Sequence, residues 1–261
     1  MTQEIAFSKY HGTGNDFILI NAFNKSIELS EQAIQTMCHR RYGIGADGLI
    51  VLRRKEGFDF FMDFYNSDGK PGSMCGNGGR CIVSFAHDLG LIKNETRFFA
   101  PDGPHKAIYE SADKISLKMA DVTDIEPHDL GLFINTGSPH LVIDKSKQTT
   151  FNVYTEGRKI RNEKKYKAEG VNVNFFQVKQ NITKIFTYER GVEDETYSCG
   201  TGTVATALTL NQLFGNSSPV TLQAKGGLLK VHFSKKDANN YTDIWLEGPT
   251  KKTFTGTYLL D

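Results

Sequence analysis

The chain has 261 residues, which suits one large domain or two domains of roughly 120 to 130 residues that each bury a core. Lys and Arg number 31 and Asp and Glu 30, and the resulting balance argues against a nucleic-acid partner, which would require a basic excess on one face. The longest apolar runs, such as Phe17–Ile20, are too short to span a bilayer, and the N-terminus lacks the zones of a signal peptide. The four cysteines are too few and too scattered for a disulfide framework, so we expect a protein of the reducing cytoplasm without a membrane partner.

The first half of the sequence predicts a series of turns and strands followed by one helix. The turn Thr13–Asn15 precedes the apolar run FILI, and Gly45–Asp47 precedes LIVL. The strand-like segment FFMDFY ends at Tyr65. The segment MCGNGGRCIVSFAHDLG then begins with a Cys-Gly turn at Cys75 and ends on Gly90, a pattern typical of a helix with a glycine cap.

The second half repeats this series in the same order. The turn Thr136–Ser138 precedes LVI, Gly170–Asn172 precedes VNFF, and the strand-like KIFTY ends at Tyr188. A second Cys-Gly turn at Cys199 opens SCGTGTVATALTLNQLFG, which ends on Gly215. The two cysteines lie 124 residues apart, and the other pairs of anchors lie 123 to 125 residues apart. Such a constant separation indicates an internal duplication rather than chance recurrence of glycine turns.

The duplication predicts an α/β fold of two pseudo-symmetric halves, each with several short strands around one helix that starts at the Cys-Gly turn. The boundary is expected near residues 120 to 130, where Asp121–Gly131 holds Pro127 and several turn formers. The halves are then residues 1–120 with Cys75 and residues 121–250 with Cys199. If the halves face each other, both helix N-termini point into one cleft.

The repeated cysteine turn predicts proton-transfer chemistry. A helix N-terminus presents unpaired N–H groups and partial positive charge, which bind a carboxylate and lower the pKa of a thiol. Inversion of a stereocentre by proton transfer needs a base on one face of the carbon and an acid on the other. A thiolate and a thiol can exchange these roles, while the helix N–H groups stabilise charge on the substrate carboxylate. This scheme needs no metal and no organic cofactor.

Less specific interpretations apply to single cysteines. A lone cysteine near a helix start is more often a small buried residue, and this interpretation fits Cys38 and Cys81, which have no counterpart in the other half. A redox pair would show Cys-x-x-Cys spacing, which is absent. The seven histidines fall at no spacing typical of zinc ligands.

At these residues the sequence resembles the diaminopimelate epimerases. The resemblance runs in the family's order over nearly the whole chain, through HGTGNDF, GIGADGL, FYNSDG, MCGNGGRC, NTGSPH, GVNVNF, YERG and SCGTGT. It implies two similar α/β halves, each a mixed sheet wrapped around a central helix, with the C-terminal strand, about residues 251–261, returning to the first half. It also implies an isomerase that interconverts L,L- and meso-diaminopimelate, without pyridoxal phosphate or metal, on the bacterial route to lysine and cell-wall precursor.

The resemblance also implies roles for individual residues. Cys75 and Cys199 would be the two bases, and His140 and Glu189 would support the thiols. The reacting carboxylate would lie at the helix ends, held by Gly76, Asn77, Gly200 and Thr201. The remaining substrate contacts would come from Asn15, Asn66, Ser138, Asn172, Glu189 and Arg190. Taken alone, His140 is more often a structural histidine, but its place in the SPH turn favours the functional role.

Two positions depart from the best-known members, and alternatives follow from them. Ser138 stands where those members carry Asn, and Gly48 stands where many carry Gln. The shorter serine would weaken a contact to the distal end of the substrate or replace it by water. One alternative is a racemase of the same fold for another amino acid, such as histidine or hydroxyproline. Arg190 favours diaminopimelate, because a second carboxylate suits a bidentate guanidinium.

A further alternative is a binding protein without chemistry, which the presence of both cysteines argues against. An amino acid, as a small-molecule substrate, is the partner expected in every case. The sequence leaves the oligomeric state open, with a homodimer as the assembly expected.

Overall fold

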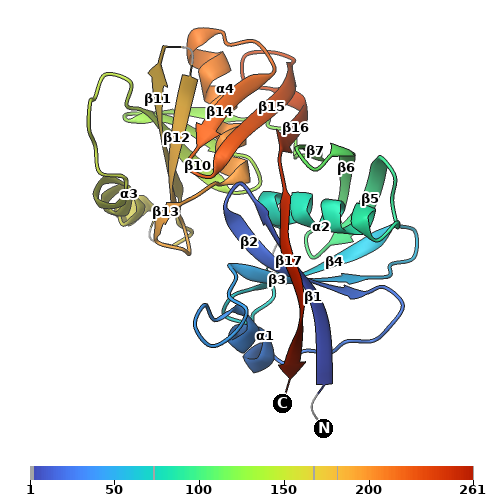
Figure 1. The fold of residues 1–261 in the computed structure, drawn as a ribbon. Helices are drawn as coiled ribbons and strands as arrows, with labels where there is room; N and C mark the ends of the chain where they lie inside the picture. The colour runs from blue at the N-terminus through green and yellow to red at the C-terminus, as the bar shows by residue number, and fades with distance from the viewer. Residues whose placement is uncertain (1–2, 73, 167, 181, 261) are drawn as a thin grey trace. The chain divides into compact units, whose positions relative to one another are not determined.

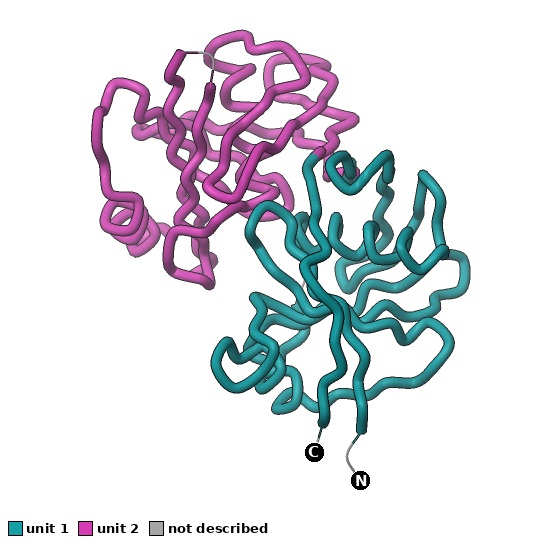
Figure 2. The backbone as a smooth tube through the Cα atoms, in the orientation of Figure 1, with its two compact units in different colours: residues 1–117, 248–261 teal, residues 118–247 magenta. Residues whose placement is uncertain are grey.

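Two units make up the chain, and the polypeptide passes from the first to the second once and then returns. Unit 1 comprises residues 1–117 and 248–261, and unit 2 comprises residues 118–247 (Figure 2). The computed structural model describes residues 3–72, 74–166, 168–180 and 182–260. The domain limits that the sequence predicts, 1–120 with 251–261 and 121–250, lie a few residues from these bounds.

The strands of unit 1 form one mixed sheet in the order β17-β1-β2-β3-β4-β5-β6-β7 (Figure 1). Their bounds are β1 (Gln3–Gly12), β2 (Asn15–Ala22), β3 (Gly48–Arg53), β4 (Phe60–Asn66), β5 (Glu95–Ala100), β6 (Gly103–Ser111), β7 (Lys114–Lys118) and β17 (Lys251–Leu260). The pairs β2–β3 and β4–β5 are parallel, and the other neighbours are antiparallel. The last strand of the chain therefore completes the sheet that the first strand begins.

The strands of unit 2 follow the same pattern. Their bounds are β8 (Ile125–His128), β9 (Gly131–Asn135), β10 (Pro139–Asp144), β11 (Asn172–Lys179), β12 (Ile182–Glu189), β13 (Asp194–Thr196), β14 (Val220–Ala224), β15 (Gly227–Lys235) and β16 (Tyr241–Gly248). The order is β8-β9-β10-β11-β12-β14-β15-β16, with β13 pairing to β12, and only β10–β11 and β12–β14 are parallel. The predicted α/β repeat is confirmed, because parallel and antiparallel strand pairs follow one another in the same order in both units.

One long helix lies against the sheet in each unit (Figure 1). In unit 1 helix α2 (Gly76–Asp88) contacts β1, β2, β3 and β6, and in unit 2 helix α4 (Gly200–Phe214) contacts β9, β10, β11, β12, β14 and β15. Three threonines of α4 are fully buried, and each donates its hydroxyl to the carbonyl four residues earlier, at 2.7 to 2.9 Å. These hydrogen bonds let a polar side chain occupy the core of the unit without an unsatisfied group.

Strand β3 shows how the unit 1 core is layered. All but its last residue are buried, as expected for an interior strand covered on both faces. Leu49 and Val51 belong to an apolar cluster with Ile34 and Met37 of α1 (Glu31–Cys38). On the opposite face Ile50 lies against Gly78 of α2, where a Cβ would come within 3.2 Å of the Ile50 side chain.

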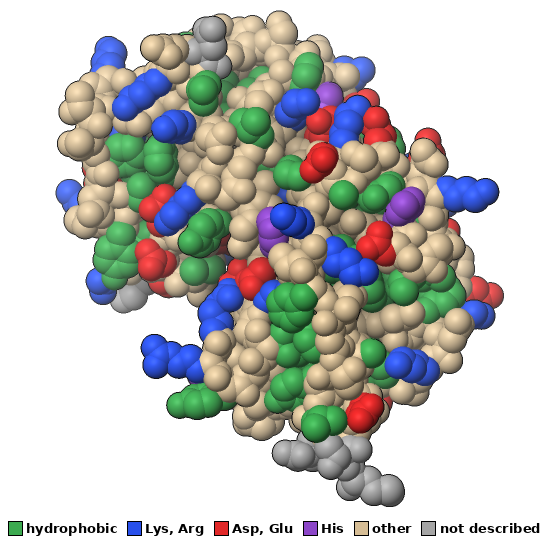
Figure 3. All heavy atoms as spheres, in the orientation of Figure 1, with side chains coloured by type: hydrophobic (Ala, Val, Ile, Leu, Met, Phe, Trp, Pro, Cys, Tyr) green, Lys and Arg blue, Asp and Glu red, His purple; other side chains and the backbone are tan. Residues whose placement is uncertain are grey.

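The remaining helices lie toward the surface. Helix α3 (Val153–Arg161) contacts β11 and β12 in unit 2, and a short 3-10 turn spans Lys164–Tyr166. No helix in the described parts of the chain is long and apolar enough to cross a membrane. On the face drawn in Figure 3, basic and acidic side chains are interspersed.

Candidate active site

Both repeated cysteines occupy the N-cap position of the long helix in their unit. Cys75 precedes α2 in extended conformation, and its carbonyl accepts from the N–H of Gly79 at 2.6 Å. Cys199 precedes α4, and its sulfur accepts from the N–H of Gly202 at 3.4 Å. The predicted helix starts are thereby confirmed. Both cysteines stand at the positive end of a helix dipole, and at Cys199 a backbone N–H also approaches the sulfur, which favours negative charge there.

The β1–β2 turn of unit 1 lies beside Cys75. The Cys75 thiol donates to Oδ1 of Asn15 at 3.6 Å, and Nδ2 of Asn77 donates to the same oxygen at 3.3 Å. The approach is close, because a Cβ at Gly12 would come within 3.1 Å of the backbone oxygen of Asn77. Thr13 adopts a φ of 49° and Gly14 a φ of 87°, so this turn uses left-handed backbone to reach the start of α2. Of the residues predicted for the site, Asn15, Cys75 and Asn77 are therefore in direct contact.

Asn66 and Gly48 lie at one end of the unit 1 sheet. Gly48 pairs with Phe17 of β2 on one side and with Asn66 of β4 on the other. Gly48 and Asn66 therefore lie level with Phe17, two residues along β2 from Asn15. Asn66 is exposed at the end of β4. A Cβ at Gly48 would lie 2.8 Å from the ring of Phe64 and from the backbone oxygen of Tyr65. Gly48 departs from the family pattern, and the packing of β4 requires a glycine at this position.

In unit 2 the equivalent sheet edge carries Ser138, Asn172 and Arg190. Nδ2 of Asn172 donates to the Ser138 hydroxyl at 2.9 Å, and Oδ1 of Asn172 accepts the N–H of Arg190 at 2.9 Å. The Arg190 guanidinium donates to Ser138 at 3.3 Å and to the carbonyl of Glu169 at 2.5 Å. Within the described ranges Arg190 has no carboxylate partner at ion-pair distance, and Glu193 pairs with Arg161 instead. Ser138 thus holds the arginine and the amide in place from within the unit.

His140 is fully buried on β10. Oδ1 of Asn174 accepts from the Thr187 hydroxyl at 2.8 Å, and in this orientation Nδ2 of Asn174 faces Nδ1 of His140, also at 2.8 Å. Since Nδ1 accepts, the proton of the neutral ring is on Nε2, which has no hydrogen-bond partner among the described residues. Burial and, to a smaller extent, the charge of Arg190 lower the pKa of His140 to about 3. His140 is a neutral N–H donor at physiological pH.

The other predicted residues of unit 2 lie at the start of α4 and the end of β12. Thr201 places its hydroxyl 3.5 Å from the Cys199 sulfur, and its carbonyl accepts from Thr136 at 2.9 Å. Glu189 accepts from the Thr196 hydroxyl at 2.8 Å. The contacts of Thr201 fix the backbone around Gly200. The contact with Thr196 fixes the carboxylate of Glu189, the residue that precedes Arg190.

Cys38 and Cys81 occupy a different environment. Both are buried, and burial raises the pKa of the Cys38 thiol to about 12 and that of the Cys81 thiol further still. A thiol of this kind stays protonated and unreactive at neutral pH. No group of three metal-ligating side chains is found within the described parts of the chain.

Sequence reasoning did not select four residues that the structure connects to the site. They are Asp47, Arg80, Asn174 and Thr187, which hydrogen-bond to Asn15, Asn77 and His140 directly or through one side chain. Three of them stand inside quoted motifs, in GADG, GNGGRC and GVNVN, where a polar residue among glycines and apolar residues was the available signal. Thr187 gave no such signal, because a threonine on a strand is ordinary.

Comparison with known proteins places these motifs in one family. A family model described as diaminopimelate epimerase matches residues 7–124 and 132–252. A diaminopimelate epimerase from Flavobacterium psychrophilum is 47% identical over 252 residues, which cover 95% of this chain and 98% of the relative. One from Chlorobaculum tepidum is 40% identical over 262 residues, covering 95% and 99%.

Solved structures share the fold at low sequence identity. A PhzF-family phenazine biosynthesis protein from Bacillus anthracis gives a TM-score of 0.76 at 12% identity, covering 99% of this chain and 100% of its own. A hydroxyproline epimerase from Agrobacterium vitis with bound trans-4-hydroxy-L-proline gives 0.70 at 13% identity, covering 99% and 93%. These similarities support the two-unit architecture.

Proposed function

Because this chain belongs to the diaminopimelate epimerase family, we propose that it interconverts L,L- and meso-diaminopimelate by moving the α-proton between Cys75 and Cys199. The observation that carries the proposal is the repeated site: two units of the same topology each place a cysteine at the N-cap of their long helix. An isomerase that attacks one carbon from both faces needs two such groups. A pair of equivalent N-cap thiols supplies them.

The reaction balances without a further reactant. One sulfur acts as thiolate and takes the α-proton, and the electron pair of the broken C–H bond moves toward the substrate carboxylate. The other sulfur gives its thiol proton to the opposite face of the carbon. The product leaves with inverted configuration, and the two sulfurs have exchanged protonation states, so the reverse reaction uses the same groups. The backbone N–H groups that begin at Gly76 and Gly200 would stabilise the charge on the carboxylate.

The distal end of diaminopimelate carries a second carboxylate and amine. We assign its binding to Arg190 and Asn172, with Ser138, Asn15, Asn66 and Glu189 as further contacts. Arg190 is supported by its position: within the described ranges it has no carboxylate partner, and Ser138 and Asn172 hold it on the edge of β11 and β12. A guanidinium held in this way can bind a substrate carboxylate by two parallel hydrogen bonds.

The setting of the reaction follows from the same proposal. We assign the enzyme to bacterial synthesis of lysine and peptidoglycan precursor, in the cytoplasm, where thiols stay reduced. We also assign it a homodimeric state, which sedimentation velocity tests.

No metal or organic cofactor has a role in this scheme. Activity should therefore persist in EDTA and carbonyl reagents and be lost on mild oxidation, returning with dithiothreitol.

Hydrogen exchange at the α-carbon tests the proposal. Diaminopimelate, lysine, histidine and hydroxyproline are each incubated with enzyme in D2O, and the α-proton signal is followed by NMR. We expect loss of that signal only for diaminopimelate. Preference for another amino acid would leave a racemase of the same fold as the function.

Cysteine variants test the two-base scheme separately. Cys75→Ser and Cys199→Ser should each abolish epimerisation while retaining the native circular dichroism spectrum, because a serine hydroxyl is a much weaker acid than a thiol. Cys38→Ser and Cys81→Ser serve as matched controls and should remain active. Wild-type turnover in either N-cap variant would contradict the scheme.

A further inference from the structure

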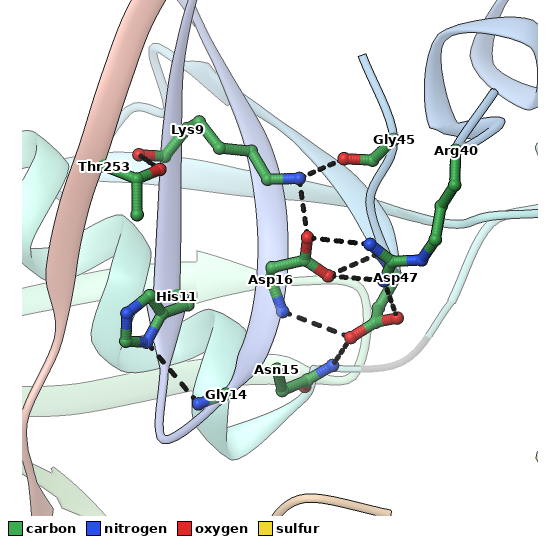
Figure 4. Close-up of polar contacts among 9 residues, drawn as sticks. All are labelled: Lys9, His11, Gly14, Asn15, Asp16, Arg40, Gly45, Asp47 and Thr253. Carbon is green, nitrogen blue, oxygen red and sulfur yellow. Dashed lines mark hydrogen bonds and ion pairs between the residues drawn. The ribbon is translucent and has the colours of Figure 1, made fainter. Parts of the chain in front are cut away.

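A chain of four side chains in unit 1 runs past Cys75. The Arg80 guanidinium donates to Oδ1 of Asn77 at 2.8 Å, and Nδ2 of Asn77 donates to Oδ1 of Asn15 at 3.3 Å. Nδ2 of Asn15 then donates to a carboxylate oxygen of Asp47 at 2.6 Å (Figure 4). All the donors point in one direction along the chain, from the cation to the anion. The field between the two charges therefore strengthens each link.

The two ends of this chain determine how both carboxamides are turned. An arginine can only donate and an ionised aspartate can only accept. Asn77 must therefore present its oxygen to Arg80, and Asn15 must present its NH2 to Asp47. What remains for Cys75 is the oxygen of Asn15, 3.6 Å from the sulfur. The thiol of Cys75 consequently faces an acceptor whose identity is set by residues that do not touch the sulfur.

Each end is itself held in place. Arg80 is fully buried, with further hydrogen bonds to the carbonyl of Gly76 at 3.3 Å and the hydroxyl of Thr13 at 3.4 Å. Among the ion pairs of the described residues, none involves Arg80. Asp47 accepts from Arg40 at 2.6 Å and from the N–H of Asp16 at 3.1 Å.

The charges at the Asp47 end are balanced. Arg40 also pairs with Asp16 at 2.7 Å, and Asp16 pairs with Lys9 at 2.6 Å (Figure 4). Two cations and two anions therefore lie together, and the charge of Arg80 is left without a compensating carboxylate within the described part of unit 1. Arg80, a buried cation five residues after Cys75, interacts electrostatically with it and favours the thiolate.

We propose that Arg80 and Asp47 are positioning residues that fix the hydrogen-bond acceptor and the positive charge beside Cys75. The proposal rests on the catalytic role of Cys75 set out above. The oxygen of Asn15 stabilises the protonated thiol, and the charge of Arg80 stabilises the thiolate. The opposed effects keep Cys75 between the two states, as required of a group that is an acid in one direction and a base in the other.

Two isosteric variants test the two effects. In Asp47→Asn, the new amide must turn its oxygen toward Arg40 and its NH2 toward Asn15, so Asn15 no longer presents a fixed oxygen to Cys75. In Arg80→Met, the side chain keeps its length and loses its charge. Both should lower kcat for diaminopimelate by about 10- to 100-fold, because a reacting group is misplaced. KM should change little in Arg80→Met and should rise in Asp47→Asn, which also turns the proposed substrate contact Asn15.

Alkylation of Cys75 separates positioning from a structural role. Iodoacetamide reacts with the thiolate, and its rate at the Cys75 peptide is followed by mass spectrometry at pH 7. We expect Asp47→Asn to raise this rate about threefold or more and Arg80→Met to lower it by a similar factor. Among the described residues, other ionisable groups near this site include Cys81 on α2, which interacts with Cys75 and Asp16, and Asp102, which accepts from the N–H of Met74 and contacts His105. Both variants leave these groups in place.

The control is Asp63→Asn, which breaks a comparable ion pair of unit 1, with Arg53 at 2.8 Å, away from Cys75. It should leave kcat and alkylation unchanged. Arg80→Lys keeps a donor-only cation and should recover much of the activity lost in Arg80→Met.

The proposal would be overturned if Asp47→Asn and Arg80→Met changed the alkylation rate in the same direction. It would also be overturned if these two variants had kcat values within twofold of that of Asp63→Asn. If wild type fails to exchange the α-proton of diaminopimelate, the proposed function is wrong. In that case the alkylation rates still test whether Arg80 and Asp47 affect the reactivity of the Cys75 thiol.

Discussion

His140 acquires its chemistry from residues on two neighbouring strands. A histidine in water would exchange between tautomers and titrate near neutral pH. Here Asn174 accepts from Thr187 and donates to Nδ1 of His140, and burial disfavours the charged ring. The side chain is therefore a neutral Nε2–H donor. In this state it can stabilise an anion but cannot remove a proton from a thiol.

We predict that His140 does not titrate between pH 5 and 8. Because its pKa is lowered to about 3, folding favours the neutral ring. The stability it contributes is fully present above the unfolded pKa, near 6.5, and is lost as the pH falls from there toward 3. The NMR signal of the His140 ring, assigned by its absence in His140→Gln, should stay constant over this range. A midpoint near 6.5 would contradict the assigned state.

Arg190 and Ser138 give a prediction about substrate recognition. Arg190→Leu would leave the distal carboxylate of diaminopimelate desolvated without a partner. The loss of such a charge-assisted contact costs roughly 2 to 5 kcal/mol, a fall of some tens to thousands in kcat/KM. Ser138→Asn should have a mild effect and restore the family's amide. Steady-state assays with diaminopimelate, lysine and histidine measure both. Undiminished activity of Arg190→Leu on diaminopimelate would refute this role.

At the scale of elements, the two long helices begin alike but pack differently. Gly78 and Gly202 occupy the same position, three residues after the N-cap cysteine of their helix. A Cβ at Gly202 would lie 2.3 Å from Oδ1 of Asn174 and 3.3 Å from the Cys199 sulfur. A Cβ at Gly78 would meet only the ends of the Ile50 and Met62 side chains at 3.2 and 3.3 Å, with the ring of Phe17 at 3.5 Å. The first contact is with a fixed hydrogen-bonded amide, whereas Ile50 and Met62 can move.

We therefore predict opposite outcomes for the two alanine variants. Gly202→Ala should displace Asn174, release the tautomer of His140, and destabilise the protein by about 1 to 3 kcal/mol, with a loss of activity. Gly78→Ala should stay within about 1 kcal/mol of wild type, because the gain in helix propensity offsets a small adjustment. Urea unfolding and the exchange assay measure the two effects. Equal destabilisation of both variants would show that the amide contact has no special role.

At the scale of the whole molecule, the duplication is visible in the strand pairing. Each unit repeats the same order of antiparallel and parallel neighbours around a helix that starts at a cysteine. The turn glycines Gly14 and Gly137 share positive φ values of 87° and 98°, and Gly45 and Gly170 share 80° and 75°. Equal backbone conformations at equal separations explain why the repeat was detectable in the sequence. Only glycine adopts such angles without strain.

The sequence alone determined the features that depend on local pattern. Helix starts at Cys75 and Cys199, the glycine that ends α4, and the two-fold repeat follow from periodicity, cap residues and glycine positions. The family motifs supplied the candidate residues as well. Helix starts, glycine caps and motifs each depend on residues close together in the chain, so they can be identified directly from the sequence.

Tertiary structure decided what depends on neighbours distant in the chain. The family resemblance implied that the C-terminal strand returns to the first half, but its pairing with β1, between residues more than two hundred positions apart, comes from the structure. The tautomer of His140 depends on Asn174 and Thr187, and the oxygen facing Cys75 depends on Asp47 and Arg80. The sequence shows that polar residues occur at these positions but not which atom each one presents. That choice is made by hydrogen bonds between elements, because an amide or an imidazole has two nearly equivalent orientations until a fixed donor or acceptor selects one.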